Sequence, residues 1–519
     1  MTYPRHSGIL LHPTSLPGPH GSGDLGQSAF HFVDWLVAGG QTLWQVLPLG
    51  GIGPGNSPYM SPSAFAGNEL LIGLTQLHTA GWLRDGEIDE DAALSNGRVD
   101  YNAVRSFRMS RLRLAAERFF SDSRKGAQRD YLAFCREEES WLNDYALFMA
   151  LESRLQPLGK VWQDLPVELV RREEEALAEA SRTLTEECSF WKFCQWCFDR
   201  QWAALKKYAN ENGIRIVGDI PIFVSCHSAD VWSNQHLFDL DAQGNPRAVA
   251  GVPPDYFSAT GQRWGNPLYR WDEHERDGYR WWSVRMERML KLCDIVRIDH
   301  FRGFESYWEV PADSPTAVIG QWKKGPGQKL FAEMHKTLGL KFGEGPDGFQ
   351  IIAEDLGIIT PEVAALRQTV GFPGMRILQF AFDGQSNNPY LPHNFMPHTV
   401  VYTGTHDNDT TVGWWRSLQD GQQDYVRRYL GIDGSDIQWD LIRAASISVA
   451  AVSIVPMQDV LGLDTSARMN CPGTADGHWE WRFTWDQVAP WHAERLLELS
   501  HLHGRLPRRK TDIIGPAGT

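Results

Sequence analysis

Eight short runs of apolar and β-branched residues recur along the chain, and several end in a polar residue followed by a loop that contains Gly or Pro. They cover residues 8–12, 42–47, 215–219, 295–299, 350–354, 375–380, 399–402 and 451–455. Apolar residues at helical spacing fill many of the intervals between them, and examples are 29–37, 281–292, 361–370 and 423–430. Near-continuously apolar strands that alternate with helices are typical of a parallel sheet, because helices cover both of its faces. Eight such strands predict an α/β fold of the (β/α)8 TIM-barrel class.

The intervals between the predicted strands are unequal, and the long ones predict insertions into a single barrel that spans 1–519. The interval 50–214 is far longer than a simple crossover, and most of it is charged, helical in pattern and poor in Gly. We therefore predict an insertion at 50–214 with an α-helical subdomain. Further insertions are predicted at 225–294, where Gly, Pro and aromatic residues are frequent, and at 304–348. We expect the inserted subdomains to be largely helical.

Composition and charge exclude several classes of protein. The 519 residues are 42% hydrophobic and 22% charged, as in ordinary globular proteins, and no apolar run approaches the length of a membrane-spanning helix. The first residues lack an apolar signal core, so secretion is not expected. A net charge of −14 disfavours binding to a phosphate backbone, so we expect neither a nucleic-acid nor a membrane partner.

The cysteines indicate a reducing compartment. Seven cysteines are an odd number spread over a long chain, which fits a cytoplasmic protein better than a disulfide framework. Cys194 and Cys197 form the one CxxC pair, with aromatic residues on both sides and no second pair at zinc spacing. We interpret that stretch as a packed core helix rather than a metal or redox site.

The 22 tryptophans are the unusual feature of the composition. An indole offers a flat apolar face and one N–H donor, which suits stacking on a sugar ring while bonding a hydroxyl. Most of these residues must fill the core, so the count by itself only favours a carbohydrate ligand.

Charged residues gather at the ends of predicted strands. Arg297 and Asp299 are two residues apart on one strand and therefore face the same side. An adjacent Arg lowers the pKa of an Asp, which suits a nucleophile that must be ionised. Glu354 ends the next strand after two isoleucines, and a carboxyl in a drier site has a raised pKa and can serve as a general acid.

Asp219 ends the third strand, and His406 and Asp407 follow the seventh. Catalytic residues of barrel enzymes come from the C-terminal ends of several strands. A single acidic strand end is usually a helix cap or a loop salt bridge, but so many acids around one mouth predict a metal site, a cationic intermediate, or both. A glycosyl oxocarbenium ion is such an intermediate.

Three of these strand ends carry motifs: Arg-Ile-Asp-His-Phe-Arg-Gly at 297–303, Ile-Ala-Glu-Asp-Leu-Gly at 352–357 and Gly-Thr-His-Asp-Asn at 404–408. They resemble motifs of the amylomaltases, the 4-alpha-glucanotransferases of the alpha-amylase clan. Further segments that agree are 8–16, 44–49, 57–62, 218–223, 251–257 and 261–267. The matches run from residue 8 to about 474, and together they are highly specific.

The resemblance implies a role for each matched residue. Asp299 would be the nucleophile, Glu354 the acid/base, and Asp407 the residue that holds and distorts the sugar. Arg297 would orient Asp299. The residues implied to line the subsite of the reacting glucose are Tyr59, Asp219 and His406. Those in the segment 251–267, which in the family is a loop over the active site, are Tyr256, Phe257, Gln262 and Trp264.

The resemblance also separates this chain from ordinary alpha-amylases. The segment after Asp219 reads Ile-Pro-Ile-Phe and lacks the His that those enzymes place shortly after that Asp. Amylomaltases share this departure and lack the C-terminal β-domain of amylases, and here little chain follows the eighth strand. Transfer is therefore favoured over hydrolysis, with no cofactor and no metal.

The sequence thus predicts a cytoplasmic, retaining 4-alpha-glucanotransferase that moves α-1,4-glucan segments from a linear donor to glucose or a maltooligosaccharide. The nearest alternative is an α-glucan hydrolase of the same clan, with the same carboxylates and water as acceptor. Two other classes are a metal-dependent barrel hydrolase and a glycan-binding protein without catalysis. The metal ligands of the first would be His12, Asp219, His300 and His406. These four residues lack the clustered His of catalytic zinc sites, which argues against the metal-dependent hydrolase. The intact set of Asp299, Glu354 and Asp407 argues against a glycan-binding protein without catalysis.

Overall fold

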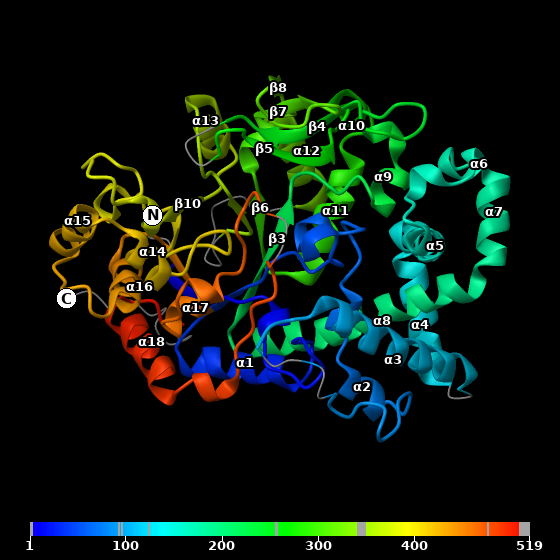
Figure 1. Ribbon diagram of the computed structural model, residues 1–519, viewed down its shortest axis with the longest axis horizontal. Coiled ribbons are helices and arrows are strands. Elements are labelled where there is room, and N and C mark those ends of the chain that lie inside the picture. The colour runs from blue at the N-terminus through cyan, green and yellow to red at the C-terminus, as the bar shows by residue number, and fades with distance from the viewer. Residues whose placement is uncertain are drawn as a thin grey trace, which may run out of the picture.

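The computed structural model describes residues 4–507 apart from 92–93, 95–96, 123–124, 255–257, 340–348 and 475–476. Eight parallel strands form its centre: β1 His6–Leu10, β2 Leu43–Gln45, β3 Arg215–Pro221, β6 Ile295–Asp299, β9 Ile351–Ala353, β10 Gly374–Ile377, β11 Thr399–Tyr402 and β12 Val452–Pro456. They close into a barrel in the order β1-β12-β11-β10-β9-β6-β3-β2. The strands β3, β6 and β10 are labelled near the centre of the molecule in Figure 1. Each of the eight predicted strands coincides with one of the barrel strands, so the predicted TIM barrel is confirmed.

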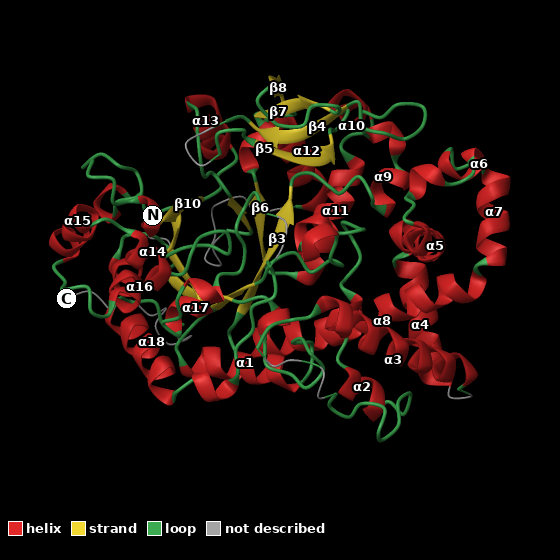
Figure 2. Ribbon diagram, in the orientation of Figure 1, coloured by secondary structure: helices red, strands yellow, loops and turns green. Residues whose placement is uncertain are grey.

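Helices surround the barrel, which explains why its strands are apolar on both faces (Figure 2). Outside the long interval between β2 and β3, the helices are α1 Gln27–Ala38, α9 Ala229–Ser233, α10 Trp271–Arg276, α11 Arg280–Leu292, α12 Gln328–Leu338, α13 Pro361–Thr369, α14 Thr411–Ser417, α15 Asp420–Leu430, α16 Ile437–Ile447, α17 Met457–Val460 and α18 Pro490–Leu502. The four helical patterns noted in the sequence fall within α1, α11, α13 and α15. The described residues after β12 contain the α-helices α17 and α18 and two short 3-10 helices, and they form no further strand.

The interval between β2 and β3 is helical, as its pattern predicts. It contains α2 Leu74–Thr79, α3 Tyr101–Ser121, α4 Lys125–Glu137, α5 Glu139–Leu155, α6 Val167–Val170, α7 Glu174–Thr183 and α8 Thr185–Glu211. Rings from α3 and α8 pack together, with the centroids of Phe119 and Trp196 5.0 Å apart. Cys194 and Cys197 are buried in the same part of α8, in agreement with the core interpretation. The long α8 also packs against α1 and β3, so it belongs to the wall of the barrel as well.

A second sheet lies at one end of the barrel, and the sequence analysis did not predict it. Its strands are β4 Ala248–Val252, β5 Gln262–Pro267, β7 Ser306–Pro311 and β8 Gln321–Lys324, in the antiparallel order β5-β4-β7-β8 (Figure 2). The inserted regions 225–294 and 304–348 therefore contain this sheet in addition to the helices α9, α10, α11 and α12. The strands are short, two of them contain Gly, and two end in Pro, so their sequence pattern does not mark them as strands.

None of the helices within the described ranges has both the length and the apolar character needed to cross a membrane.

Candidate active site

Neighbouring barrel strands bring the predicted carboxylates to the same end of the barrel. In the pairing of β3 with β6, Asp219 lies opposite Arg297 and Pro221 lies opposite Asp299. Glu354 directly follows β9, and its N–H donates to the carbonyl of Ile298 on β6 over 3.0 Å. The carboxyl ends of parallel strands meet at one edge, so these side chains converge on the mouth of the barrel.

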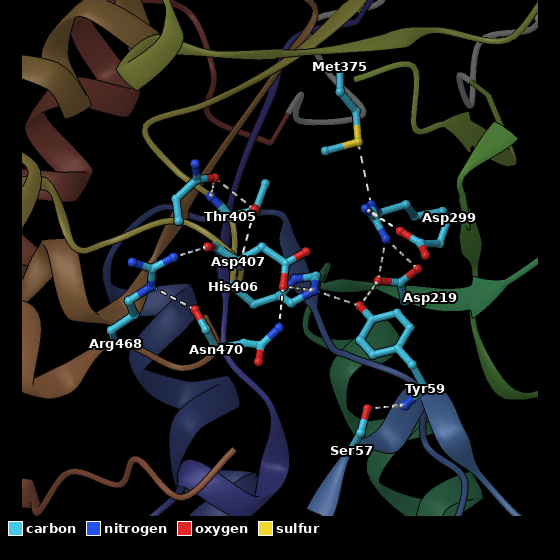
Figure 3. A network of polar contacts seen from close by, with 12 residues as sticks. Ser57, Tyr59, Asp219, Asp299, Met375, Thr405, His406, Asp407, Arg468 and Asn470 are labelled. Atoms are coloured by element: carbon cyan, nitrogen blue, oxygen red, sulfur yellow. Dashed lines mark hydrogen bonds and ion pairs between the residues drawn. The ribbon is translucent and has the colours of Figure 1, made fainter. Parts of the chain in front are cut away.

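Arg297 is the buried cation of this mouth. Its Nη1 donates to both carboxylate oxygens of Asp219, over 2.7 and 2.6 Å, and its Nη2 lies 2.9 Å from Oδ1 of Asp299. Its Nε lies 3.4 Å from the sulfur of Met375 (Figure 3). The guanidinium therefore fixes two carboxylates at once, as expected for a residue that orients Asp299.

The pKa of Asp299 is raised, to about 6, and the sequence-based expectation of a lowered pKa is wrong. Burial has the largest effect, and the carboxylates of Asp219 and Asp407 act in the same direction, while Arg297 opposes them. Arg297 already forms a bidentate pair with Asp219, so its charge is shared between two acids. The sequence shows the adjacent Arg but not the burial that outweighs it.

Burial and the nearby Asp299 raise the pKa of Glu354 further, to about 8. Two backbone donors hold its oxygens: His300 N–H donates to Oε2 over 2.6 Å, and Leu356 N–H donates to Oε1 over 2.8 Å. His300 adopts a left-handed backbone conformation with φ of 52°, which is uncommon for a residue with a side chain. The end of β6 thus supplies the nucleophile candidate, and the turn after it supplies a donor that positions the acid candidate.

Tyr59 joins the two sides of the mouth. Its hydroxyl donates to Oδ2 of Asp219 over 2.8 Å and lies 2.9 Å from Nε2 of His406. The Tyr59 and His406 rings stack with centroids 5.3 Å apart, and Trp479 packs against both. Because Asp219 is fully buried with both oxygens engaged, it acts on the mouth through Arg297 and Tyr59 (Figure 3).

Asp407 is the most exposed of the candidate carboxylates, with 43% of its side chain accessible. Asn470 Nδ2 donates to its Oδ1 over 2.6 Å, and Arg468 Nη2 donates to its main-chain carbonyl over 2.6 Å. Sequence reasoning did not single out Asn470 or Arg468. Both residues lie in an irregular segment after β12, and neither stands at the end of a predicted strand. The sequence feature that could have indicated a functional loop is the polar run Arg468-Met-Asn470 close to Pro472 and Gly473.

Two residues of the segment over the site lie on β5. The Trp264 ring meets the His300 ring edge-on with centroids 4.8 Å apart, and its Nε1 donates to Oε1 of Gln262 over 3.1 Å. Trp264 is therefore in contact with the residue that follows Asp299. Tyr256 and Phe257 lie outside the described residues.

The histidines of the alternative metal site do not form one. Within the part of the chain that the structure describes, no group of three or more His, Cys, Asp or Glu is arranged to hold a metal ion. Burial lowers the pKa of His12 and of His300, each to about 3. Both oxygens of Asp219 and Nε2 of His406 are engaged by Arg297 and Tyr59, as described above.

Comparisons with known proteins agree over nearly the whole chain. A family model described as 4-alpha-glucanotransferase matches residues 11–487. The 4-alpha-glucanotransferase of Thermus thermophilus is 50% identical over 515 residues, which cover 98% of this chain and 100% of that protein. The chloroplastic/amyloplastic 4-alpha-glucanotransferase DPE1 of Arabidopsis thaliana is 43% identical over 97% of this chain and 86% of its own length.

Solved structures give the same result. The amylomaltase of Streptococcus agalactiae, solved in complex with acarbose, superposes with a TM-score of 0.92 at 38% identity, covering 97% of this chain and 100% of that one. The amylomaltase of Corynebacterium glutamicum shares the fold, with a TM-score of 0.75 at 18% identity over 96% of this chain and 75% of that one.

Proposed function

The chain belongs to the family of 4-alpha-glucanotransferases, enzymes that transfer glycosyl groups with retention, and we propose that Asp299, Glu354 and Asp407 carry out this transfer. Asp299 is the nucleophile, Glu354 the general acid and base, and Asp407 the residue that holds the reacting sugar. The observation that carries the proposal is the geometry of two neighbouring strand ends: Arg297 Nη2 holds Asp299 over 2.9 Å, and two backbone N–H groups hold Glu354 over 2.6 and 2.8 Å. The order of the two pKa values, about 6 for Asp299 and about 8 for Glu354, supports the same division of roles. Near neutral pH, Asp299 is ionised while Glu354 keeps its proton.

The reaction proceeds in two displacements. In the first, the Asp299 carboxylate attacks the anomeric carbon, the bond from that carbon to the glycosidic oxygen breaks, and Glu354 gives its proton to that oxygen. The shortened glucan leaves with a new hydroxyl. In the second, Glu354 takes the proton from a hydroxyl of the acceptor glucan, which attacks the same carbon and releases Asp299. Two inversions leave the configuration retained.

Arg297 and Asp407 support the cationic transition state. Arg297 keeps the carboxylate of Asp299 in place through its Oδ1 and is itself held by Asp219. The exposed carboxylate of Asp407, oriented by Asn470, is available to sugar hydroxyls and adds negative charge beside the developing oxocarbenium ion. Tyr59 and His406 complete the subsite of the reacting glucose.

The segment from β4 to β5 is the surface that we assign to the acceptor glucan. Trp264 offers an indole next to the turn that carries Asp299, and Gln262, which bonds it, offers an amide to sugar hydroxyls. We also propose Tyr256 and Phe257, which belong to the same segment of the sequence, as substrate-binding residues. A site closed by aromatic rings keeps water from the glycosyl-enzyme, which transfer requires.

The substrates we propose are linear α-1,4-glucans as donors and glucose or maltooligosaccharides as acceptors. The acarbose complex of the similar Streptococcus agalactiae amylomaltase supports an oligosaccharide ligand. We also propose a cytoplasmic location, because all seven cysteines are free thiols and a reducing compartment preserves them. A single catalytic barrel with insertions at 50–214, 225–294 and 304–348 is the domain division that we propose.

Trapping the intermediate tests the assignment of Asp299 and Glu354. Glu354→Gln removes the proton donor, so transfer between natural glucans should fall by several orders of magnitude. An α-glycosyl fluoride needs little protonation of its leaving group, so with this variant a glycosyl-enzyme should accumulate. Mass spectrometry of peptides should find the adduct on Asp299, and Asp299→Asn in the same background should abolish it. An adduct on another residue would refute the nucleophile assignment.

A further inference from the structure

Two tryptophans among the described residues are strongly exposed, Trp322 at 42% and Trp491 at 47%. Trp322 lies on β8, the outermost strand of the second sheet, and Trp491 lies on α18. Most tryptophans of this chain are buried, so a large indole left in solvent on a sheet edge is a departure from the rest of the molecule. Tryptophan is enriched where one flat face must meet a ligand.

The indole of Trp322 is held in place. The guanidinium of Arg302 lies over its ring, 4.1 Å from the centroid. Trp308 is its direct partner across β7 and β8, with ring centroids 5.2 Å apart at 64°, and Nε1 of Trp308 donates to the carbonyl of Ala317 over 2.9 Å. A side chain fixed in this way loses little conformational freedom when a ligand stacks on it.

The same contacts connect Trp322 to the candidate active site. Three peptide steps separate Arg302 from Asp299, which at about 3.8 Å each keeps their Cα atoms within about 11 Å. Gly325 N–H donates to the carbonyl of Glu305 over 2.8 Å, so the end of β8 is bonded to the turn that follows Asp299. Nη1 of Arg302 also donates to the carbonyl of Ile358, in the loop that follows Glu354. Arg302 thus links Trp322 to both loops that leave the strands of Asp299 and Glu354.

The surroundings of Trp322 combine apolar and polar groups. Val318 and Ile319 are exposed in the turn that leads into β8, and Ile358 is exposed beside Arg302. On the same face of β8 as Trp322, two residues further along the strand, Lys324 pairs with Glu305. A sugar ring needs this combination, because its C–H faces are apolar and its rim carries hydroxyls. The large apolar side chains exposed here are Trp322, Val318, Ile319 and Ile358, far fewer than the roughly 20–30 residues that each side of a stable protein interface contributes.

We propose that Trp322, supported by Arg302 and Trp308, is a remote subsite for a linear α-1,4-glucan whose reacting end occupies the Asp299–Glu354 site. This rests on the proposed function and adds the length of the glucan to it. A short oligosaccharide reacts within the mouth, and a long chain gains an additional contact as it leaves the barrel over β8.

The test compares chain lengths in Trp322→Ala, with Trp491→Ala as the matched control. Loss of one aromatic contact should raise the KM for amylose roughly two- to tenfold. The KM and kcat for maltotriose should not change, and Trp491→Ala should leave both substrates unaffected. Trp322→Phe, which keeps a flat ring, should restore most of the affinity for amylose. Calorimetry with maltoheptaose on Asp299→Asn, with and without Trp322→Ala, should show the same loss without turnover.

The remaining outcomes contradict either the Trp322 subsite or the proposed function. An unchanged KM for amylose in Trp322→Ala overturns the subsite. An equal rise of KM for maltotriose and amylose also overturns it, because Trp322 then acts through the catalytic loops. Failure of the unmodified enzyme to convert maltotriose would instead contradict the proposed function, and the two failures are therefore distinguishable.

Discussion

At the scale of single residues, the protonation of Asp299 and Glu354 is set by burial and by charged groups around the mouth of the barrel. Asp299, Glu354 and Asp407 stand at strand ends within recognisable motifs, so their convergence follows from the barrel. The pKa of Asp299 depends on burial and on Asp219, which is close in space and distant in sequence. Asn470 escaped prediction for the same reason, because its contact with Asp407 spans 63 positions.

The raised pKa values predict a bell-shaped dependence of kcat/KM on pH. Below about 6, Asp299 takes up a proton and cannot attack, and above about 8, Glu354 loses the proton that the leaving oxygen needs. Activity should therefore rise through about pH 6 and fall through about pH 8, and these two midpoints are macroscopic pKa values of the interacting pair.

Arg297→Met removes the cation that lowers the pKa of Asp299, so the rising limb of the pH profile should move to higher pH. Profiles of maltotriose transfer check this, and an unshifted rising limb would contradict the role of Arg297.

A second prediction concerns the hydroxyl of Tyr59. Tyr59→Phe removes the bridge between Asp219 and His406 while keeping the stacked ring. A hydrogen bond to a charged group is worth about 1.5–3 kcal/mol, so kcat/KM should fall about ten- to a hundredfold. Tyr208→Phe is the control, because it removes a hydroxyl that donates to Asp34 over 2.6 Å on the surface of α8. Steady-state kinetics should separate the two variants, and equal activities would show that the bridge does not matter.

At the scale of elements, the barrel strands were predictable because burial on both faces makes them continuously apolar. The second sheet was not, since its strands are short and partly exposed. The burial of β8 Gln321–Lys324, for instance, gives no apolar alternation. Long-range pairing, such as Trp308 with Trp322, decides these strands. The loop after β11 was predicted to be functional, but the group that holds it was not.

That group is Asp459 on α17, a buried carboxylate that fastens both ends of the loop. Its Oδ2 accepts from the hydroxyls of Thr403 and Thr411, over 2.6 and 2.7 Å, and its Oδ1 accepts from Thr411 N–H over 2.7 Å. The residues between these two threonines include His406 and Asp407. Asp459→Ala should therefore lower kcat about ten- to a hundredfold by loosening Asp407, since each lost buried bond costs about 1 kcal/mol or more.

Isosteric variants separate positioning from general stability. Thr403→Val removes one hydroxyl donor, and in the Asp459→Ala background it should have little further effect, because the bond is already lost. Glu138→Gln is the matched control, since Glu138 is a buried carboxylate that accepts from Trp141 over 2.6 Å in the helical insertion. It should lower Tm and leave kcat unchanged. If Asp459→Ala lowers Tm alone, the positioning role is wrong.

At the scale of the whole molecule, the uneven spacing of strands indicated where chain is inserted but not what it builds. The long interval before β3 forms a helical layer whose α8 also closes the barrel wall. The high tryptophan content likewise does not show what each indole does. Seven indoles are almost completely buried: Trp44, Trp162, Trp196, Trp202, Trp232, Trp282 and Trp439. Core filling thus explains much of the count, and composition alone does not distinguish these residues from Trp264 at the mouth.

The last prediction concerns what the whole site does with the glycosyl-enzyme. Water is present at about 55 M, so a transferase must exclude it and bind an acceptor in its place. With maltotriose, we expect glucose and longer oligosaccharides with almost no rise in total reducing ends, because each transfer breaks one bond and forms one. Hydrolysis adds a reducing end each time.

Trp264 on β5 contacts His300 in the turn after Asp299, so Trp264→Ala should admit water to the site and raise the share of hydrolysis severalfold. Trp491→Ala, an exposed tryptophan on α18, should leave that share unchanged. Chromatography of the products with a reducing-end assay measures both, and reducing ends that rise in step with maltotriose loss in the unmodified enzyme would favour the hydrolase alternative.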